Sequence, residues 1–281
     1  MGYDFIAIQQ ICQKTRVKTM TAPAFSLLHY RVEDGIADII LDNPPANVIT
    51  PQMTDEYFAA LDLADADPDV RIIILSGKGK GLSGGVDLKL LDTFGPTEMK
   101  AFLARFYVEM IDKVRSLSKP IMASVHGYAM EGACTLAFAC DMVIASDDAK
   151  FGYPGVPNLA APPGMHVWFL QRLIGRMKAA ELIYTGDTIS AVKAESLGMI
   201  TRVVPRDELT KESRKLATKI AAMSPVGLRA ARELIYRMEN MDFKTVPGTA
   251  LDAVALAFAS DDSKEARRAF VEKRKPVWTG K

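Results

Sequence analysis

Two strand-like segments that run directly into glycine-rich turns constrain the fold of this chain more than any other feature. Val70–Leu75 is rich in β-branched residues and is typical of a strand buried on both faces; Gly77–Gly85 follows it. Ile121–Val125 is a second such strand, and Gly127–Ala133 connects it to a helix that ends near Cys140. Because such strands lie inside sheets covered by helices, the chain is predicted to be an α/β protein.

The surrounding segments continue the alternation of strands, turns and helices. Leu27–Val32 and Ile36–Leu41 are predicted to form a hairpin around a turn of acidic residues and glycine. Thr50 is a predicted N-cap for the helix that follows. A long helix is predicted over Thr97–Leu117 and a further strand over Asp141–Ala145. This order favours an architecture of repeated β-β-α units.

The C-terminal quarter of the chain is mostly helical. Helical spacing, punctuated by proline and glycine, covers Arg206–Met223, Pro225–Met238, Val246–Ser260 and Asp262–Lys273. We therefore divide the chain into an N-terminal extension (1–24), an α/β core (25–204) and a helical C-terminal part (205–281). Leu251, Val254, Leu256 and Phe258 make one of these helices apolar. We expect it to contact other subunits, with packing on the chain's own core as the alternative.

Composition excludes several classes of protein. The formal net charge is +1, and without a basic stripe or zinc-finger spacing we expect no nucleic-acid partner. No apolar run reaches the roughly 18–20 residues of a membrane span, and the N-terminus lacks the features of a signal peptide. Cys12, Cys134 and Cys140 are odd in number and match no metal pattern. We therefore expect inert thiols, no metal site and a cytoplasmic location.

The two glycine-rich junctions can carry chemistry. Turns with little side-chain bulk let backbone N–H groups face a ligand, and two N–H groups that converge on one carbonyl oxygen form an oxyanion hole. The second junction also opens a helix, whose N-terminus favours developing negative charge. Either turn alone could equally be structural.

Four segments together resemble the crotonase (enoyl-CoA hydratase/isomerase) superfamily, and the resemblance covers roughly residues 27–276. The similar segments are L-S-G-G-V-D-L at 82–88, K-P-I-M-A-S-V-H-G-Y-A-M-E-G-A-C at 119–134, A-K-F-G-Y-P-G at 149–155, and Y-T-G with A-E-S-L-G-M-I at 184–200. The end of the chain, F-V-E-K-R-K-P, is also similar to the family's closing residues. The chain is identified as a member of this superfamily.

The resemblance implies a spiral of β-β-α units with a helical C-terminal part, assembled as homotrimers or hexamers. It implies that the N–H groups of Val86 and Gly132 form the oxyanion hole that holds an acyl-CoA thioester. It requires no cofactor other than the coenzyme A of the substrate. Residues implied in substrate or CoA binding are Ala46, Val48, Ser83, Gly85, Asp87, Leu88, Lys89 and Gly155. Lys89 either meets a CoA phosphate or is a surface lysine.

The chain departs from the family where hydratases hold and activate water. Thr135 and Gly155 occupy the positions of the two hydratase glutamates, and Pro163 occupies that of a glycine whose N–H helps to hold the water. Threonine is not a base near neutral pH without a partner, glycine has no side chain, and proline has no N–H. Simple hydration of an enoyl-CoA is therefore not expected.

Other residues could supply the acid or base. Glu131 lies next to Gly132; we expect it to face solvent, with a displaced carboxylate in the pocket as the alternative. His166 could replace a carboxylate because imidazole titrates near neutrality. Tyr153 could donate a phenolic proton, and Thr135 remains a candidate. His126 is expected to be a hydrogen-bonded structural histidine.

Three functions remain open from the sequence. The first is an acyl-CoA enzyme of the lyase or isomerase class that stabilises an enolate for isomerisation, decarboxylation or hydrolysis. The second is a hydratase with relocated acid and base groups, and the third is a non-catalytic acyl-CoA-binding relative. The predicted long helix favours an apolar acyl group, with a bulky or cyclic one as an option, because it carries Phe102, Phe106, Tyr107 and Met110.

Overall fold

The computed structural model describes residues 25–161 and 164–281. The expected N-terminal extension, Cys12 and Pro163 lie outside these residues. Within them, a six-stranded sheet has the order β1-β2-β3-β4-β6-β9. Its strands are β1 (Leu28–Glu33), β2 (Ile36–Leu41), β3 (Ile72–Gly77), β4 (Ile121–Val125), β6 (Met142–Ser146) and β9 (Arg202–Val204). The chain is an α/β protein, as the sequence predicts.

The sheet begins with an antiparallel hairpin and continues with parallel strands. β1 pairs antiparallel with β2, and every later pair is parallel, with Ile73 opposite Ile121 in the centre. Alternate residues of β3 face opposite sides: Ile73 and Leu75 join the main core, whereas Ile72 and Ile74 join a smaller one. Both faces are therefore covered, which explains the continuous apolar run.

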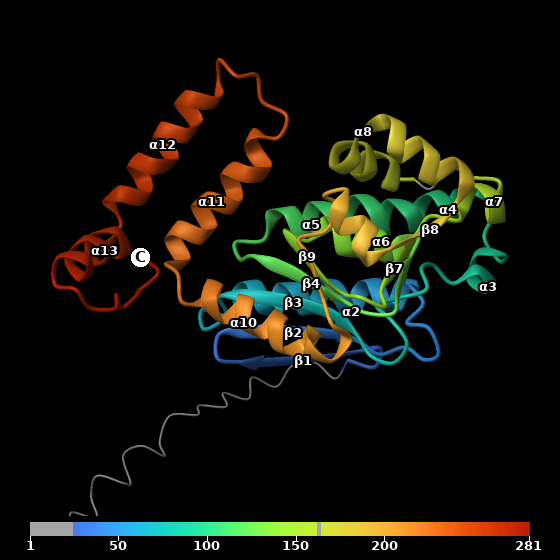
Figure 1. The fold of residues 1–281 in the computed structure, drawn as a ribbon, viewed down its shortest axis with the longest axis horizontal. Helices are drawn as coiled ribbons and strands as arrows, with labels where there is room; N and C mark the ends of the chain where they lie inside the picture. The colour runs from blue at the N-terminus through green and yellow to red at the C-terminus, as the bar shows by residue number, and fades with distance from the viewer. Residues whose placement is uncertain (1–24, 162–163) are drawn as a thin grey trace, which may run out of the picture.

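Helices cover the two faces of the sheet (Figure 1). α10 (Leu209–Ala221) contributes Leu209 and Ala217 to the smaller core. The main core is closed by several helices, namely α2 (Pro51–Ala66), α4 (Pro96–Leu103), α5 (Met110–Ser116), α6 (Gly132–Ala139) and α8 (His166–Thr185). Thr50 caps α2 by accepting a hydrogen bond from the Met53 N–H, as expected.

The predicted helix over Thr97–Leu117 is not a single α-helix. Between α4 and α5 the chain forms a π-helix, η1 (Ala104–Glu109). The wider turn brings two consecutive side chains, Phe106 and Tyr107, into the interior at 1% and 8% exposure. In a regular α-helix, neighbours in sequence point about 100° apart. π-helical turns are frequent at functional sites.

A second, three-stranded sheet was not foreseen from the sequence. Its order is β5-β7-β8, with β5 (Tyr128–Met130), β7 (Lys150–Gly152) and β8 (Thr188–Ser190). Single bridges extend this layer, pairing Ser83 with Ala129 and Ile49 with Val86. The layer therefore joins the two glycine-rich turns. Short helices flank it: α3 (Leu88–Leu91), α7 (Gly155–Leu159) and α9 (Ala191–Ser196).

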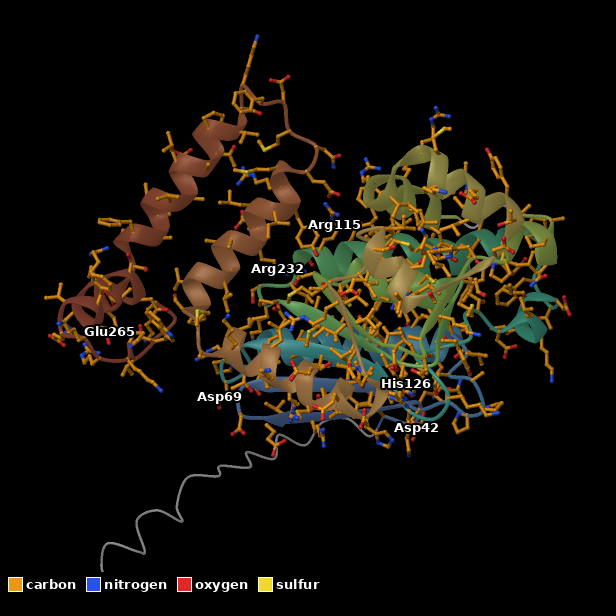
Figure 2. All side chains as sticks on the ribbon, in the orientation of Figure 1. Asp42, Asp69, Arg115, His126, Arg232 and Glu265 are labelled. Atoms are coloured by element: carbon orange, nitrogen blue, oxygen red, sulfur yellow. The ribbon has the colours of Figure 1, made fainter. Side chains whose placement is uncertain are left out.

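The last three helices extend away from the sheet (Figure 1). They are α11 (Pro225–Met238), α12 (Val246–Ala259) and α13 (Asp261–Val271). α11 is tied to the core by the buried guanidinium of Arg232, which donates to Asp141 at 3.0 Å and to the carbonyl oxygens of Val114, Arg115 and Leu117. Arg115 and Arg232 lie where α11 meets the core (Figure 2).

α12 leaves a row of apolar side chains uncovered. Leu251, Val254, Leu256 and Phe258 are 68%, 60%, 77% and 59% exposed. These residues do not pack on the chain's own core, which removes the alternative considered for this helix. None of the helices in the described parts of the chain is both long and apolar enough to cross a bilayer.

Candidate active site

The two glycine-rich turns lie side by side. The Leu82 N–H donates to the Tyr128 carbonyl oxygen at 2.9 Å, and the Met130 N–H donates to the Ser83 carbonyl oxygen at 3.1 Å. On the opposite edge of the first turn, the Gly84 N–H donates to the Ala46 carbonyl oxygen at 2.8 Å. Segments that are far apart in the sequence thus form one small layer of backbone.

The loop that contains Ala46 and Val48 is fixed to this layer. The Ile49 N–H donates to the Gly85 carbonyl oxygen at 2.8 Å, and the Asp87 N–H donates to the Ile49 carbonyl oxygen at 3.1 Å. The buried Asn47 side-chain amide donates to the carbonyl oxygen of Gly81 at 3.1 Å. The residues expected to contact the CoA arm therefore lie on adjacent edges of this layer of backbone.

Gly85 permits the close approach of the two turns. Its φ is +93°, and a Cβ there would lie 2.8 Å from the Met130 carbonyl oxygen and 3.0 Å from the Glu131 Cβ. The Ser83 hydroxyl accepts a hydrogen bond from the Gly85 N–H at 3.0 Å and so holds the turn. Any side chain at this position would push apart the two turns that carry Val86 and Gly132.

The N–H groups of Val86 and Gly132 are the candidate oxyanion donors. Neither of them donates a hydrogen bond to any group in the described part of the chain. Gly132 is the first residue of α6, and a Cβ there would lie 2.9 Å from Phe106 Cε1 and 3.0 Å from Ile49 Cδ1. The turns therefore bring together two donors with apolar walls beside them, an arrangement that can bind a developing oxyanion.

Glu131 does not face solvent as the sequence analysis expected. Its side chain is only 19% exposed, and Oε2 lies 3.5 Å from Nε2 of His166. Oε1 is buried without a hydrogen-bond partner among the described residues. A Cβ at Gly155 would lie 3.2 Å from this oxygen. The carboxylate thus borders the space that a side chain at Gly155 would enter, beside the candidate oxyanion donors.

The backbone of Glu131 makes this orientation possible. Its φ and ψ are 48° and −117°, a region that residues with a side chain rarely adopt. The Glu131 N–H is held by the Gly152 carbonyl oxygen at 2.9 Å, and its own carbonyl oxygen accepts from the Cys134 N–H at 2.9 Å. Strain of this kind persists only where neighbouring structure enforces it.

His166 and Thr135 meet beneath the carboxylate. Thr135 is fully buried on α6, and its Oγ1 lies 2.5 Å from Nδ1 of His166, the first residue of α8. His166 is 1% exposed, and its Nε2 also lies 3.5 Å from the Tyr107 hydroxyl. Burial lowers the pKa of His166, while Glu131 raises it by a smaller amount. His166 is therefore a neutral imidazole at neutral pH.

Tyr153 borders the same cluster. Its ring centroid lies 4.8 Å from that of His166, and its hydroxyl is buried without a hydrogen-bond partner in the described chain. Burial raises the pKa of Tyr153 well above its ordinary value, and burial also raises the pKa of Tyr107. Both are neutral phenols that can donate a hydrogen bond but do not act as bases.

The remaining residues named from the sequence lie outside this cluster. Asp87 caps α3 by accepting from the Lys89 N–H at 3.0 Å, so it orders the turn. Leu88 and Lys89 are exposed at the start of α3. His126 bonds the Gly79 carbonyl oxygen at 2.9 Å, in agreement with a structural role. In the described residues, no group of three or more His, Cys, Asp or Glu side chains is arranged to hold a metal ion.

Sequence reasoning named Glu131, His166, Thr135 and Tyr153 singly but did not foresee that they form one cluster. It also placed Tyr107 only in a wall, whereas its hydroxyl faces the His166 ring. The clue available in the sequence was the simultaneous loss of both glutamates. With glycine at 155, the space there is open to a neighbouring side chain, and Glu131 borders it.

The fold agrees with comparisons to known proteins. The sequence profile described as Enoyl-CoA hydratase/isomerase matches residues 31–281. The chain therefore belongs to the enoyl-CoA hydratase/isomerase family, with the crotonase fold.

Particular relatives cover nearly the whole chain. A probable enoyl-CoA hydratase of Bacillus subtilis is 35% identical over 252 residues, which are 89% of this chain and 97% of the relative. A crotonyl-CoA hydratase of Syntrophomonas wolfei is 32% identical, covering 89% of this chain and 96% of the relative. A crystal structure of an enoyl-CoA hydratase subunit from Geobacillus kaustophilus has a TM-score of 0.85 and 34% identity, covering 92% and 99% of the two chains.

Proposed function

We propose that this chain is an acyl-CoA enzyme that stabilises an enolate between the N–H groups of Val86 and Gly132, with Glu131 as the group that moves the proton. The observation that carries the proposal is the Glu131 carboxylate, whose buried, unbonded oxygen borders the open space at Gly155 and belongs to the residue directly before the candidate donor Gly132. A free carboxylate oxygen next to such donors is suited to remove the proton α or γ to the thioester carbonyl.

A single carboxylate favours isomerisation among the enolate reactions. The base removes a proton from one carbon, the electrons move into the thioester oxygen, and the same group returns the proton to another carbon. No water is consumed, so the altered water site formed by Thr135 and Gly155 is no obstacle. Decarboxylation and hydrolysis would use the same two N–H donors and remain within this class of chemistry.

Hydration with relocated groups is the second candidate. It is favoured by the contact between Glu131 and His166, since a water between two titratable groups could be activated by one while the other protonates the substrate. Several relatives are named as enoyl-CoA hydratases or probable hydratases. The difference between the two candidates is whether water oxygen enters the product.

Isotope labelling separates these reactions in one experiment. The protein is incubated with straight-chain and cyclic 2- and 3-enoyl-CoA thioesters in either deuterated water or ¹⁸O-water, and products are read by mass spectrometry. Isomerisation gives a chromatographically distinct product without ¹⁸O, with deuterium only to the extent that Glu131 exchanges its proton with solvent before returning it; hydration inserts both deuterium and ¹⁸O, and thioester hydrolysis puts ¹⁸O into the free acid. Glu131→Gln is the matched variant, because it keeps the shape and removes the base. Bound CoA thioester without any product would instead support a non-catalytic relative.

We extend the proposal to the rest of the substrate. The CoA arm lies along Ala46, Val48 and the segment from Ser83 to Leu88, with the exposed Lys89 available to a phosphate. No other cofactor or metal takes part. Phe102, Phe106 and Met110 line the acyl group and favour an apolar one. The support is the placement of these residues around the two turns.

Assembly is also part of the proposal. The chain itself leaves the apolar residues of α12 uncovered. Because the family that the chain resembles forms trimers or hexamers, a second copy of the chain is the proposed partner for this surface. A cytoplasmic location is supported by Cys134 and Cys140, which are buried free thiols. Sedimentation at micromolar concentration tests the assembly, and a monomer would contradict it.

A further inference from the structure

The proposed proton transfer by Glu131 leaves Thr135 without a role. Thr135 nevertheless occupies a position that carries a catalytic glutamate in the family pattern. Its hydroxyl is completely buried on α6. The only side-chain hydrogen bond that this hydroxyl makes within the described residues is to Nδ1 of His166, at 2.5 Å. A buried hydroxyl with one partner can fix what that partner does with its other nitrogen.

The neutral His166 ring can exist as either of two tautomers. A neutral imidazole has one N–H donor and one lone-pair acceptor. If the proton is on Nδ1, the Nε2 lone pair opposes the Glu131 carboxylate at 3.5 Å, and the Tyr107 hydroxyl, also at 3.5 Å, would have to donate to it. If the proton is on Nε2, it faces the carboxylate, and Nδ1 accepts from the Thr135 hydroxyl. The second arrangement is favoured, because an N–H facing a carboxylate is a stronger interaction than a neutral hydroxyl facing a lone pair that a carboxylate also opposes.

The other groups around His166 do not reverse this choice. Tyr107 from η1 and Tyr153 from the segment before α7 face the ring, and Cys134 on α6 adjoins Tyr153. Burial raises the pKa of each of these groups, so all of them are neutral. Glu131 is therefore the one charged group in contact with His166 among the described residues.

We propose that Thr135 is a positioning residue that holds His166 as the Nε2–H tautomer, and that this N–H in turn orients the Glu131 carboxylate towards the substrate. The proposal rests on the proposed role of Glu131 for its consequence in catalysis, but the tautomer itself does not depend on any activity. Thr135, His166 and Glu131 then form a chain of polar contacts, from the Thr135 hydroxyl through the imidazole ring to the carboxylate whose Oε1 is unbonded.

The tautomer is read directly by nitrogen NMR of protein labelled with ¹⁵N-histidine. Comparison with His166→Gln assigns the His166 signals against those of His29 and His126. The expected result is a neutral Nε2–H ring throughout the neutral pH range. Thr135→Ser keeps the hydroxyl and should keep this pattern, whereas Thr135→Val keeps the shape and should shift the ring towards the Nδ1–H form. A wild-type Nδ1–H or charged ring, or a Val variant with unchanged signals, would overturn the proposal.

Kinetics give the second readout. Residues that hydrogen-bond to a functional side chain without touching the substrate commonly contribute about 10- to 100-fold to activity. We expect Thr135→Val to lower kcat by that factor with little change in KM, while Thr135→Ser stays close to the wild type. Equal losses in both variants would reduce Thr135 to a packing residue.

The two levels of the proposal fail separately. Full activity in Glu131→Gln removes Glu131 from the chemistry and sinks the proposed function, whereas the NMR result for Thr135 stands or falls independently of it.

Discussion

Replacing Glu131 by glycine should make the protein more stable and nearly inactive. A residue with a side chain at φ 48° and ψ −117° costs about 1–3 kcal/mol relative to glycine. The buried Oε1 without a partner costs a further ~1–3 kcal/mol. Against these gains, glycine loses about 0.5–1 kcal/mol through the greater freedom of the unfolded chain. Together these terms predict a net gain of about 1–5 kcal/mol in the free energy of unfolding.

Two further variants separate the contributions. Glu131→Ala removes the buried oxygen but keeps the strained backbone, so it should gain only part of the stability. Asp34→Gly is a control at an exposed turn with φ 51°, remote from the site, and it should leave activity unchanged. The measurements are urea unfolding at one protein concentration, because assembly adds to apparent stability, and turnover of the thioester panel.

The activity of Glu131→Gly should fall by about 10²–10⁴-fold, the usual contribution of a positioned acid or base. A variant that is no more stable than the wild type would show that the neighbouring structure relieves the strain in another way. A variant that is more stable and fully active would refute the assignment of Glu131 as the proton-transfer group.

Three other outcomes are expected. Arg232→Met should lower the free energy of unfolding by about 3–5 kcal/mol, because it leaves the partly buried Asp141 without its ion pair. In the same urea unfolding experiment, the exposed control Arg237→Met should change this free energy by less than about 0.5 kcal/mol. Equal effects of the two variants would contradict this reasoning. Because burial lowers the pKa of His166 from 6.5, the unfolded chain binds a proton that the folded chain does not. The free energy of unfolding should therefore fall as the pH drops below about 6.5, and His166→Gln should flatten this slope between about pH 5 and pH 7; an unchanged slope would refute it. Leu256→Glu should yield monomers in analytical ultracentrifugation at concentrations where the wild type is assembled, and an assembled variant would exclude α12 as the contact surface.

The sequence was most informative where structure depends on local patterns. β2 (Ile36–Leu41) and α11 (Pro225–Met238) have the bounds that their apolar spacing and turn residues predict. Family membership followed from short motifs around the two glycine-rich turns, and the profile match confirms it. The division at residues 204 and 205 and the roles of the individual site residues stay predictions.

Features that depend on distant contacts were not predictable. β5 and β7 have three residues each, too few for a recognisable period, and they exist because they pair with each other. The orientation of Glu131 depends on the open space at Gly155 and on a backbone conformation that the residue type disfavours. A solvent-facing glutamate was the natural expectation because burial of an ionised side chain is costly.

The π-helical stretch from Ala104 to Glu109 has a consequence for how this site tolerates changes in chain length. A π turn holds more residues than an α turn, so loss of one residue within it would restore a regular helix without a gap. Because the wider turn takes up its extra residue locally, α4 and α5 on either side would keep their directions. A single-codon deletion would instead act inside the turn, where Phe106 and Tyr107, neighbours in sequence, could no longer both face the interior. Length variation at this point therefore reshapes the wall beside His166 without breaking the fold, which offers related chains a simple route to a differently shaped acyl pocket.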